Sequence, residues 1–156
     1  MKNTKNTKFN SLAKDYLVRL NNVFDDQIFL QIEKLSNDLK KIWMSNKNVF
    51  ICGNGGSAAN AMHMANDFHY GIGACGPAPS LPGLNVEALS SNSAVITCLG
   101  NDMGFEDIYS HQIEVKANES DLLIVLSGSG NSANVVNAEK ELDAILWQDK
   151  LYSSPD

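Results

Sequence analysis

Two segments of the sequence place an apolar run directly before a loop of glycine and serine, and a helix-like segment follows each loop. The first is VFICGNGGSAANAMHMANDF at 49–68, and the second, at 121–145, begins DLLIVLSGSGNS. A short apolar run that ends at such a loop is typical of a strand buried on both faces of a parallel sheet. Strand, loop and helix in this repeated order predict an α/β fold with helices on both faces of the sheet.

The remaining segments extend this pattern. Apolar residues recur every three or four positions over 9–20 and 28–42, which predicts two N-terminal helices, the second capped by Asp25 or Asp26. Three strands are expected, at 48–52, 85–89 and 121–126. Helices are expected at 57–68, at 105–117 and from 133 onward, a helical turn at 94–99 before a polar GND segment at 100–102, and a proline-rich loop at 71–83.

Charge limits the kind of partner. The chain has 156 residues, enough for one domain with a core, and a net charge of −6, which argues against a nucleic-acid or anionic-membrane surface. No lysine or arginine lies between Lys47 and Lys116. A ligand bound by this central stretch is therefore not held by local cationic side chains.

Cysteine usage and the N-terminal segment predict a cytoplasmic protein. Cys52, Cys75 and Cys98 are odd in number and lack a C-x-x-C spacing, which favours reduced thiols over disulfides or a zinc knuckle. The opening MKNTKNTKFN has no apolar segment behind it, so no signal peptide is expected. No apolar run reaches the length of a membrane span.

The two loops predict an anion site. A helix N-terminus after a glycine-rich turn presents unpaired N–H groups and the positive end of the helix dipole. Gly53, Gly55 and Gly56 allow close approach to an anion, and Ser57 adds a hydroxyl. The second loop adds three hydroxyls and two glycines, at Ser127, Gly128, Ser129, Gly130 and Ser132. A tight turn alone also needs glycine, and neither loop matches a nucleotide P-loop or GxGxxG.

His63 and Asp67 are four residues apart on the helix that follows the first loop, so they share one face. The pair can hold a metal or a substrate, or can form an ordinary surface hydrogen bond. His69 and His111 lack comparable partners and are expected to be structural.

Three ordered segments resemble the sugar isomerase (SIS) family, and within it the phosphoheptose isomerases. They are CGNGGSAANAMHMANDF at 52–68, LGNDMGFEDIYSHQIE at 99–114 and LSGSGNSANVVNA at 126–138. The resemblance implies a three-layer, flavodoxin-like αβα fold forming one domain. Residues 1–46 would be N-terminal helices, 47–138 the SIS core and 139–156 a divergent tail. It also implies an isomerase that interconverts sedoheptulose 7-phosphate and glycero-manno-heptose 7-phosphate, a homotetramer with active sites near subunit interfaces.

The resemblance assigns roles to matching positions. It implies zinc ligation by His63 and Asp67, and catalysis by Asp67, where the family has a glutamate that acts as base. It implies substrate binding by Asn54, Gly55, Gly56, Ser57, Asp67, Asn101, Asp102, Ser127, Gly128, Ser129 and Ser132. Moving a proton between C1 and C2 through an enediol needs such a base and stabilisation of the developing oxyanion.

Two departures from the family limit these implications. Aspartate at 67 is shorter than glutamate by about 1.5 Å, one C–C bond. The family continues with further strands and a helix that bears a glutamine and a histidine, which complete the zinc site. Here we expect a truncated or frame-shifted relative, or alternatively a naturally shorter member, with an incomplete sheet and an incomplete zinc site. The alternative function is a non-catalytic SIS module that binds a phosphosugar or a protein such as a replication initiator.

Overall fold

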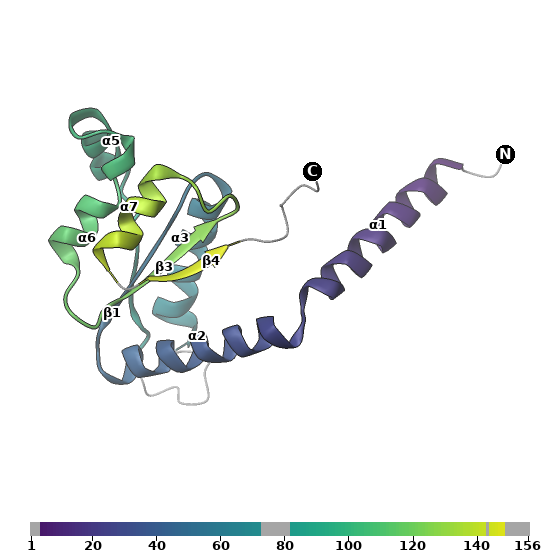
Figure 1. The fold of residues 1–156 in the computed structure, drawn as a ribbon, viewed down its shortest axis with the longest axis horizontal. Coiled ribbons are helices and arrows are strands. Elements are labelled where there is room, and N and C mark those ends of the chain that lie inside the picture. Colours follow the sequence, from purple (N-terminus) through teal and green to yellow (C-terminus); the bar gives the residue numbers. More distant parts are fainter. Residues whose placement is uncertain (1–3, 73–81, 143, 149–156) are drawn as a thin grey trace. The chain divides into compact units, whose positions relative to one another are not determined.

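The computed structural model describes residues 4–72, 82–142 and 144–148 (Figure 1). Its backbone contacts divide the chain into two units, residues 1–37 and 38–156. Within the described residues, no helix is both long and apolar enough to cross a bilayer.

The first unit consists of α1 (Thr4–Val23) and the first part of α2 (Asp26–Met44). Asp25 caps α2, because its Oδ1 accepts a hydrogen bond from the Ile28 N–H at 2.8 Å. Asp25 is one of the two residues predicted for this role. The two N-terminal helices predicted from apolar periodicity are confirmed.

The second unit is an α/β structure. It contains the end of α2, β1 (Asn48–Gly53), α3 (Gly56–Asn66), the π-helical segment η1 (Asp67–Gly71), β2 (Asn85–Ala88), α5 (Ser93–Asp102), the 3-10 segment η2 (Phe105–Asp107), α6 (Ser110–Lys116), β3 (Leu122–Ser127), α7 (Ala133–Glu141) and β4 (Ala144–Gln148). All strand pairs are parallel, and the strand order is β2-β1-β3-β4. The predicted α/β class with a parallel sheet is confirmed.

Helices cover both faces of the sheet (Figure 1). Phe50 and Cys52 of β1 belong to a buried cluster with Ile113 of α6 and Val135 of α7. Val49 and Ile51 alternate with them and point to the other face, and α3 packs against the strands. The result is the three-layer αβα arrangement predicted from the sequence.

Asp121 fixes the start of the two central strands. Its carboxylate accepts hydrogen bonds of 2.9 Å each from the backbone N–H and the side-chain amide of Asn48 and from the N–H of Asn118. Burial favours the neutral acid, but these hydrogen bonds and the nearby Lys47 outweigh it, so the pKa of Asp121 lies below its ordinary value. The register of β1 against β3 is thus set at their amino ends.

The structure corrects three expectations. Among the described residues the sheet has four strands rather than three, because Leu123–Ser127 of β3 pair with residues 144–148 of β4. These residues lie within the segment 139–156, which was expected to be a divergent tail. Residues 100–102 are not a polar segment after a short turn but the end of the ten-residue helix α5. The predicted helix 105–117 is divided into η2 and α6. Most of the predicted loop 71–83 lies outside the described residues.

Candidate functional site

The two glycine and serine loops lie side by side at the carboxyl ends of the two central strands. They follow β1 and β3, which are neighbours and pair in register from Val49↔Leu122 to Gly53↔Leu126. The chain continues from β1 to one side of the sheet and from β3 to the other, so the strand order reverses between these strands. In open parallel sheets, ligands bind outside the carboxyl ends of the strands at such a point.

The first loop has a shape that requires glycine. A Cβ on Gly53 would lie 2.7 Å from the Leu126 carbonyl oxygen and 2.8 Å from the Ser57 Cβ, so no side chain fits there. Gly55 has φ 54° and ψ −119°, a backbone conformation that residues with a Cβ rarely adopt. The Ser57 N–H donates to the Asn54 carbonyl oxygen at 3.0 Å and closes the turn. The helix α3 therefore begins directly after the carboxyl end of β1.

The second loop is organised by its own serines. Ser127 is buried, and its Oγ accepts a hydrogen bond from the Gly130 N–H at 3.0 Å. The Ser129 Oγ accepts one from the Asn131 N–H at 3.3 Å. Ser132 is the N-cap residue of α7, yet its side chain makes no capping hydrogen bond. Its hydroxyl is therefore available to a ligand at the N-terminus of α7.

A reciprocal amide pair joins the two loops. The Asn54 Nδ2 donates to the Asn134 Oδ1 at 2.9 Å, and the Asn134 Nδ2 donates back to the Asn54 Oδ1 at 2.9 Å. Asn134 is 2% exposed in the first turn of α7. Sequence reasoning missed Asn134. The available signal was its place four residues before Ala138, on the core-facing stripe of a helix, where a polar side chain needs a partner.

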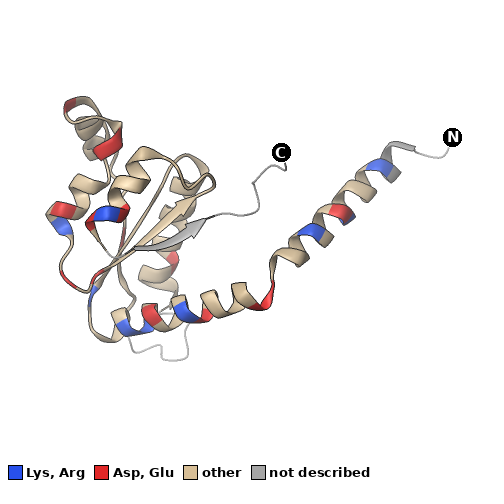
Figure 2. Cartoon of the chain, in the orientation of Figure 1, with Lys and Arg blue, Asp and Glu red and all other residues tan. Residues whose placement is uncertain are grey.

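The two loops carry no charged side chains. Neither 53–57 nor 127–132 contains a charged residue. Figure 2 shows the tan, uncharged ribbon where β1 and β3 pass into α3 and α7. Lys116, which ends the long stretch without cationic residues, pairs with Glu87 at 2.6 Å. An anion at this edge would be held by backbone N–H groups, hydroxyls and the dipoles of α3 and α7.

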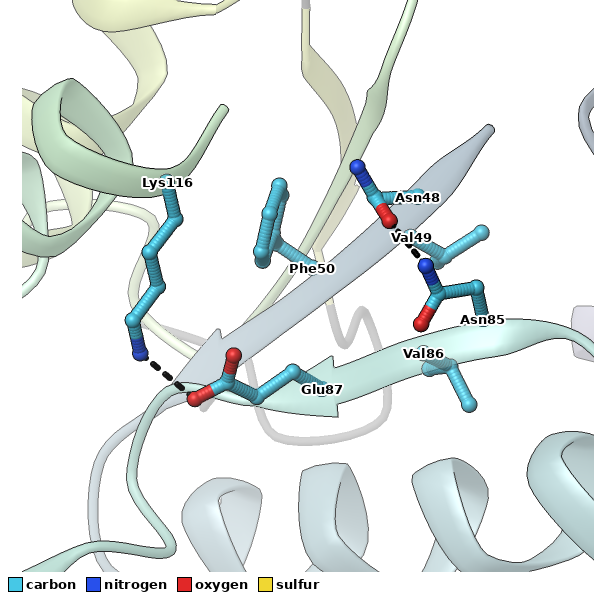
Figure 3. Close-up of a pocket in the computed structure, with 7 residues that line it drawn as sticks. All are labelled: Asn48, Val49, Phe50, Asn85, Val86, Glu87 and Lys116. Carbon is cyan, nitrogen blue, oxygen red and sulfur yellow. Dashed lines mark hydrogen bonds and ion pairs between the residues drawn. The ribbon is translucent and has the colours of Figure 1, made fainter. Parts of the chain in front are cut away.

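A shallow hollow of about 240 Å³ lies at the other end of the sheet (Figure 3). It is lined by Asn48, Val49, Phe50, Asn85, Val86, Glu87 and Lys116. Asn48 and Asn85 begin their strands and are hydrogen-bonded to each other. Because the two loops follow the carboxyl ends of their strands, this hollow is separate from the candidate site.

His63 and Asp67 form the pair expected from their spacing. The His63 Nδ1 lies 3.1 Å from the Asp67 Oδ2, and the two side chains are 76% and 58% exposed. The second carboxylate oxygen of Asp67 accepts a hydrogen bond of 3.4 Å from the Asn66 amide. Asp67 begins η1, where the helix widens after α3. The pair is therefore an exposed unit on the helix that starts at the first loop.

Asn101 and Asp102 form a separate group at the end of α5. The Asn101 Nδ2 donates to the Asp102 Oδ1 at 2.6 Å, and the other oxygen accepts a hydrogen bond from Cys98 at 3.5 Å, which raises the pKa of the Cys98 thiol. All three side chains are exposed. In the part of the chain that the structure describes, no hydrogen bond joins Asn101 or Asp102 to either loop.

The SIS domain model matches residues 14–144. The chain belongs to the SIS domain family. This match includes both loops, the His63/Asp67 pair and the end of α5.

Relatives of this SIS chain are phosphoheptose isomerases. That of Burkholderia pseudomallei (strain K96243) is 33% identical over 135 residues, which cover 86% of this chain and 66% of the relative. That of Aneurinibacillus thermoaerophilus is 33% identical over 114 residues, which cover 73% of this chain and 55% of the relative. The chain thus spans between half and two thirds of these relatives.

Solved structures agree with this fold. The phosphoheptose isomerase of Neisseria gonorrhoeae has a TM-score of 0.69 at 27% identity, with coverage of 92% of this chain and 73% of the other. That of Francisella tularensis has a TM-score of 0.74 at 26% identity, with coverage of 92% and 74%.

The resemblance to the SIS family implies zinc ligation by His63 and Asp67. Catalytic zinc takes three protein ligands and leaves one position open. His63 and Asp67 supply two, and they contact each other. Among the described residues, no group of three or more His, Cys, Asp or Glu side chains could hold a metal ion. Within the described residues, His63 and Asp67 therefore offer one ligand fewer than a catalytic zinc takes.

Proposed function

We propose that this SIS chain binds a phosphorylated sugar at the carboxyl ends of β1 and β3 and isomerises sedoheptulose 7-phosphate to glycero-manno-heptose 7-phosphate. The observation that supports the proposal is the joining of two neutral, hydroxyl-rich loops by the Asn54–Asn134 pair. A phosphate ester suits such a site, because N–H groups and hydroxyls can hold its oxygens without a cationic side chain.

The proposed roles follow from where the groups lie. Ser132 and the first N–H groups of α7 would bind the phosphate, with Ser129 and Gly128 beside them. Asp67 would remove a proton from the carbon next to the carbonyl, and His63, 3.1 Å from its carboxylate, would orient it. Phosphate binding remote from the reacting carbons would supply energy that positions the sugar.

A second function, a non-catalytic module that binds a phosphosugar or a protein partner, is favoured by one observation. The Asp67 side chain is 58% exposed, and aspartate is one methylene shorter than the glutamate that the resemblance places at this position. A displacement of about 1 Å in a catalytic group can lower the rate roughly 100-fold. This function predicts binding without turnover.

The test uses the purified chain with sedoheptulose 7-phosphate, with and without added zinc, and measures both binding and the aldose product. Turnover lost in Asp67→Asn, with binding retained, supports the isomerase. Binding without turnover supports the non-catalytic module. Absence of both, in a chain that unfolds cooperatively, contradicts the phosphosugar site itself.

Two further expectations belong to this proposal. Assembly into a homotetramer is to be measured by sedimentation equilibrium. A cytoplasmic location is to be measured by cell fractionation. Neither changes the roles assigned to the loops.

A further inference from the structure

Tyr109 contacts the first loop from within the core. Its side chain is 2% exposed, and its hydroxyl donates a hydrogen bond of 2.5 Å to the Gly53 carbonyl oxygen. The residue directly precedes α6, 56 positions along the chain from Gly53. A buried tyrosine hydroxyl usually needs a partner. Here that partner is the last residue of β1, immediately before the loop.

This hydrogen bond fixes the direction of the next amide. The Gly53 C=O and the Asn54 N–H belong to one peptide unit, which is planar and trans, so they point in opposite directions. Because the carbonyl is held toward Tyr109 in the core, the Asn54 N–H points away from the hydroxyl. The orientation of the loop's first amide is therefore set by a residue of another element.

The neighbouring contacts leave this peptide little freedom. A Cβ at Gly53 would clash with the Leu126 carbonyl oxygen and the Ser57 Cβ, so both neighbouring segments approach this peptide closely. The side chain of Asn54 is held by Asn134. Burial, with a smaller effect of the nearby Cys52, raises the pKa of Tyr109 to about 12, so the hydroxyl remains a donor at neutral pH. The hydrogen bond from Tyr109 to the Gly53 carbonyl can be removed by deleting one oxygen atom, as in Tyr109→Phe.

We propose that Tyr109 is a positioning residue for phosphosugar binding: by holding the Gly53 carbonyl, it presents the amide of Asn54 in the geometry that the ligand requires. This inference rests on the proposed function. Tyr109 acts through the loop and has no contact with the sugar. The role is independent of Asp67 and of turnover.

The test compares Tyr109→Phe with Ile113→Val by calorimetric titration of sedoheptulose 7-phosphate and by urea unfolding. Ile113 is 1% exposed in the same core cluster, so its variant weakens the core without touching the loop. Both variants should lower the urea midpoint. Only Tyr109→Phe should raise the Kd, by roughly five- to ten-fold for the loss of one oriented hydrogen bond.

The outcomes separate this inference from the proposed function. Binding by the wild type with an equal Kd in Tyr109→Phe overturns the positioning role alone. No binding by the wild type overturns both. An amide measurement on the wild type needs no variant: the ¹⁵N–¹H signal of Asn54 should shift when the ligand is added. An unmoved Asn54 signal beside shifted signals of Ser129 and Ser132 also overturns the inference.

Discussion

The Asn54–Asn134 pair offers a direct test of how the two loops are coupled. The perturbation is a double-mutant cycle of Asn54→Ala, Asn134→Ala and the double variant. Each single substitution removes both 2.9 Å hydrogen bonds. The two singles differ in what they leave behind, because Asn134 is buried whereas Asn54 is only half-buried.

The loss in the free energy of unfolding of each variant follows from this difference in burial. Two neutral hydrogen bonds contribute about 1–3 kcal/mol together. Asn54→Ala also leaves the buried Asn134 amide without its partner, which adds about 1–3 kcal/mol, whereas water can reach Asn54 in the reverse variant. We expect Asn54→Ala to be at least as destabilising as Asn134→Ala. The double variant should lose about 1–3 kcal/mol less free energy of unfolding than the sum of the losses in the two single variants.

Urea unfolding followed by circular dichroism measures the free energies, and calorimetric titration of sedoheptulose 7-phosphate measures the effect on the loops. Asn60→Ala, an exposed asparagine on α3, is the matched control and should be additive with Asn134→Ala. Additivity of the two loop variants within about 0.5 kcal/mol would refute the coupling. Unchanged ligand affinity in both singles would show that the pair supports the fold but not the site.

Three further predictions concern backbone strain, acid stability and thiol reactivity. Gly55→Ala should lower the free energy of unfolding by about 1–3 kcal/mol, because the backbone there has φ 54°, although the added Cβ would meet no other atom. Gly56→Ala is the control, because its Cβ also meets open space at the start of α3. It should be neutral or slightly stabilising in thermal unfolding. Hydrogen bonds lower the pKa of Asp121 below its ordinary 3.8 despite burial, so its carboxylate stabilises the fold above that pH, and this stability is lost as the pH falls through the lower folded value. Asp121→Asn should therefore make the free energy of unfolding fall less steeply with decreasing pH. An unchanged slope would contradict this. Under native conditions iodoacetamide should label the exposed Cys98 but not Cys52, because burial raises the pKa of Cys52 to about 12; equal labelling in peptide mass spectra would show that the core opens readily.

Local patterns were sufficient to predict most of the elements. The apolar runs before the two loops and the periodicity of 9–20 and 28–42 report burial within a few residues, and the structure contains those strands and helices. The fourth strand was missed because its surroundings differ. Residues 144–148 follow α7 without a glycine and serine loop, so the sequence contained no strand-and-loop unit to match.

The contacts that build the site could not be predicted in the same way. Asn54 and Asn134 are 80 positions apart, and Tyr109 and Gly53 are 56 apart. Their pairing depends on the register of β1 against β3 and on the packing of α6 and α7, which no local pattern specifies. The loops were predictable as an anion site. The residues that fix their geometry appeared only in the fold.

The two parts of the candidate site differ in how firmly the fold holds them. The loops are fixed by buried side chains, Tyr109 on one carbonyl and Asn134 on one amide. His63 and Asp67 are exposed and held mainly by each other. A rigid site binds its ligand without first having to be ordered, whereas an exposed pair gains a defined position only when substrate or a partner covers it. Phosphate binding should therefore come first and bring the sugar to Asp67, so Asp67→Asn should lower kcat with little change in Kd, while loop variants should change Kd.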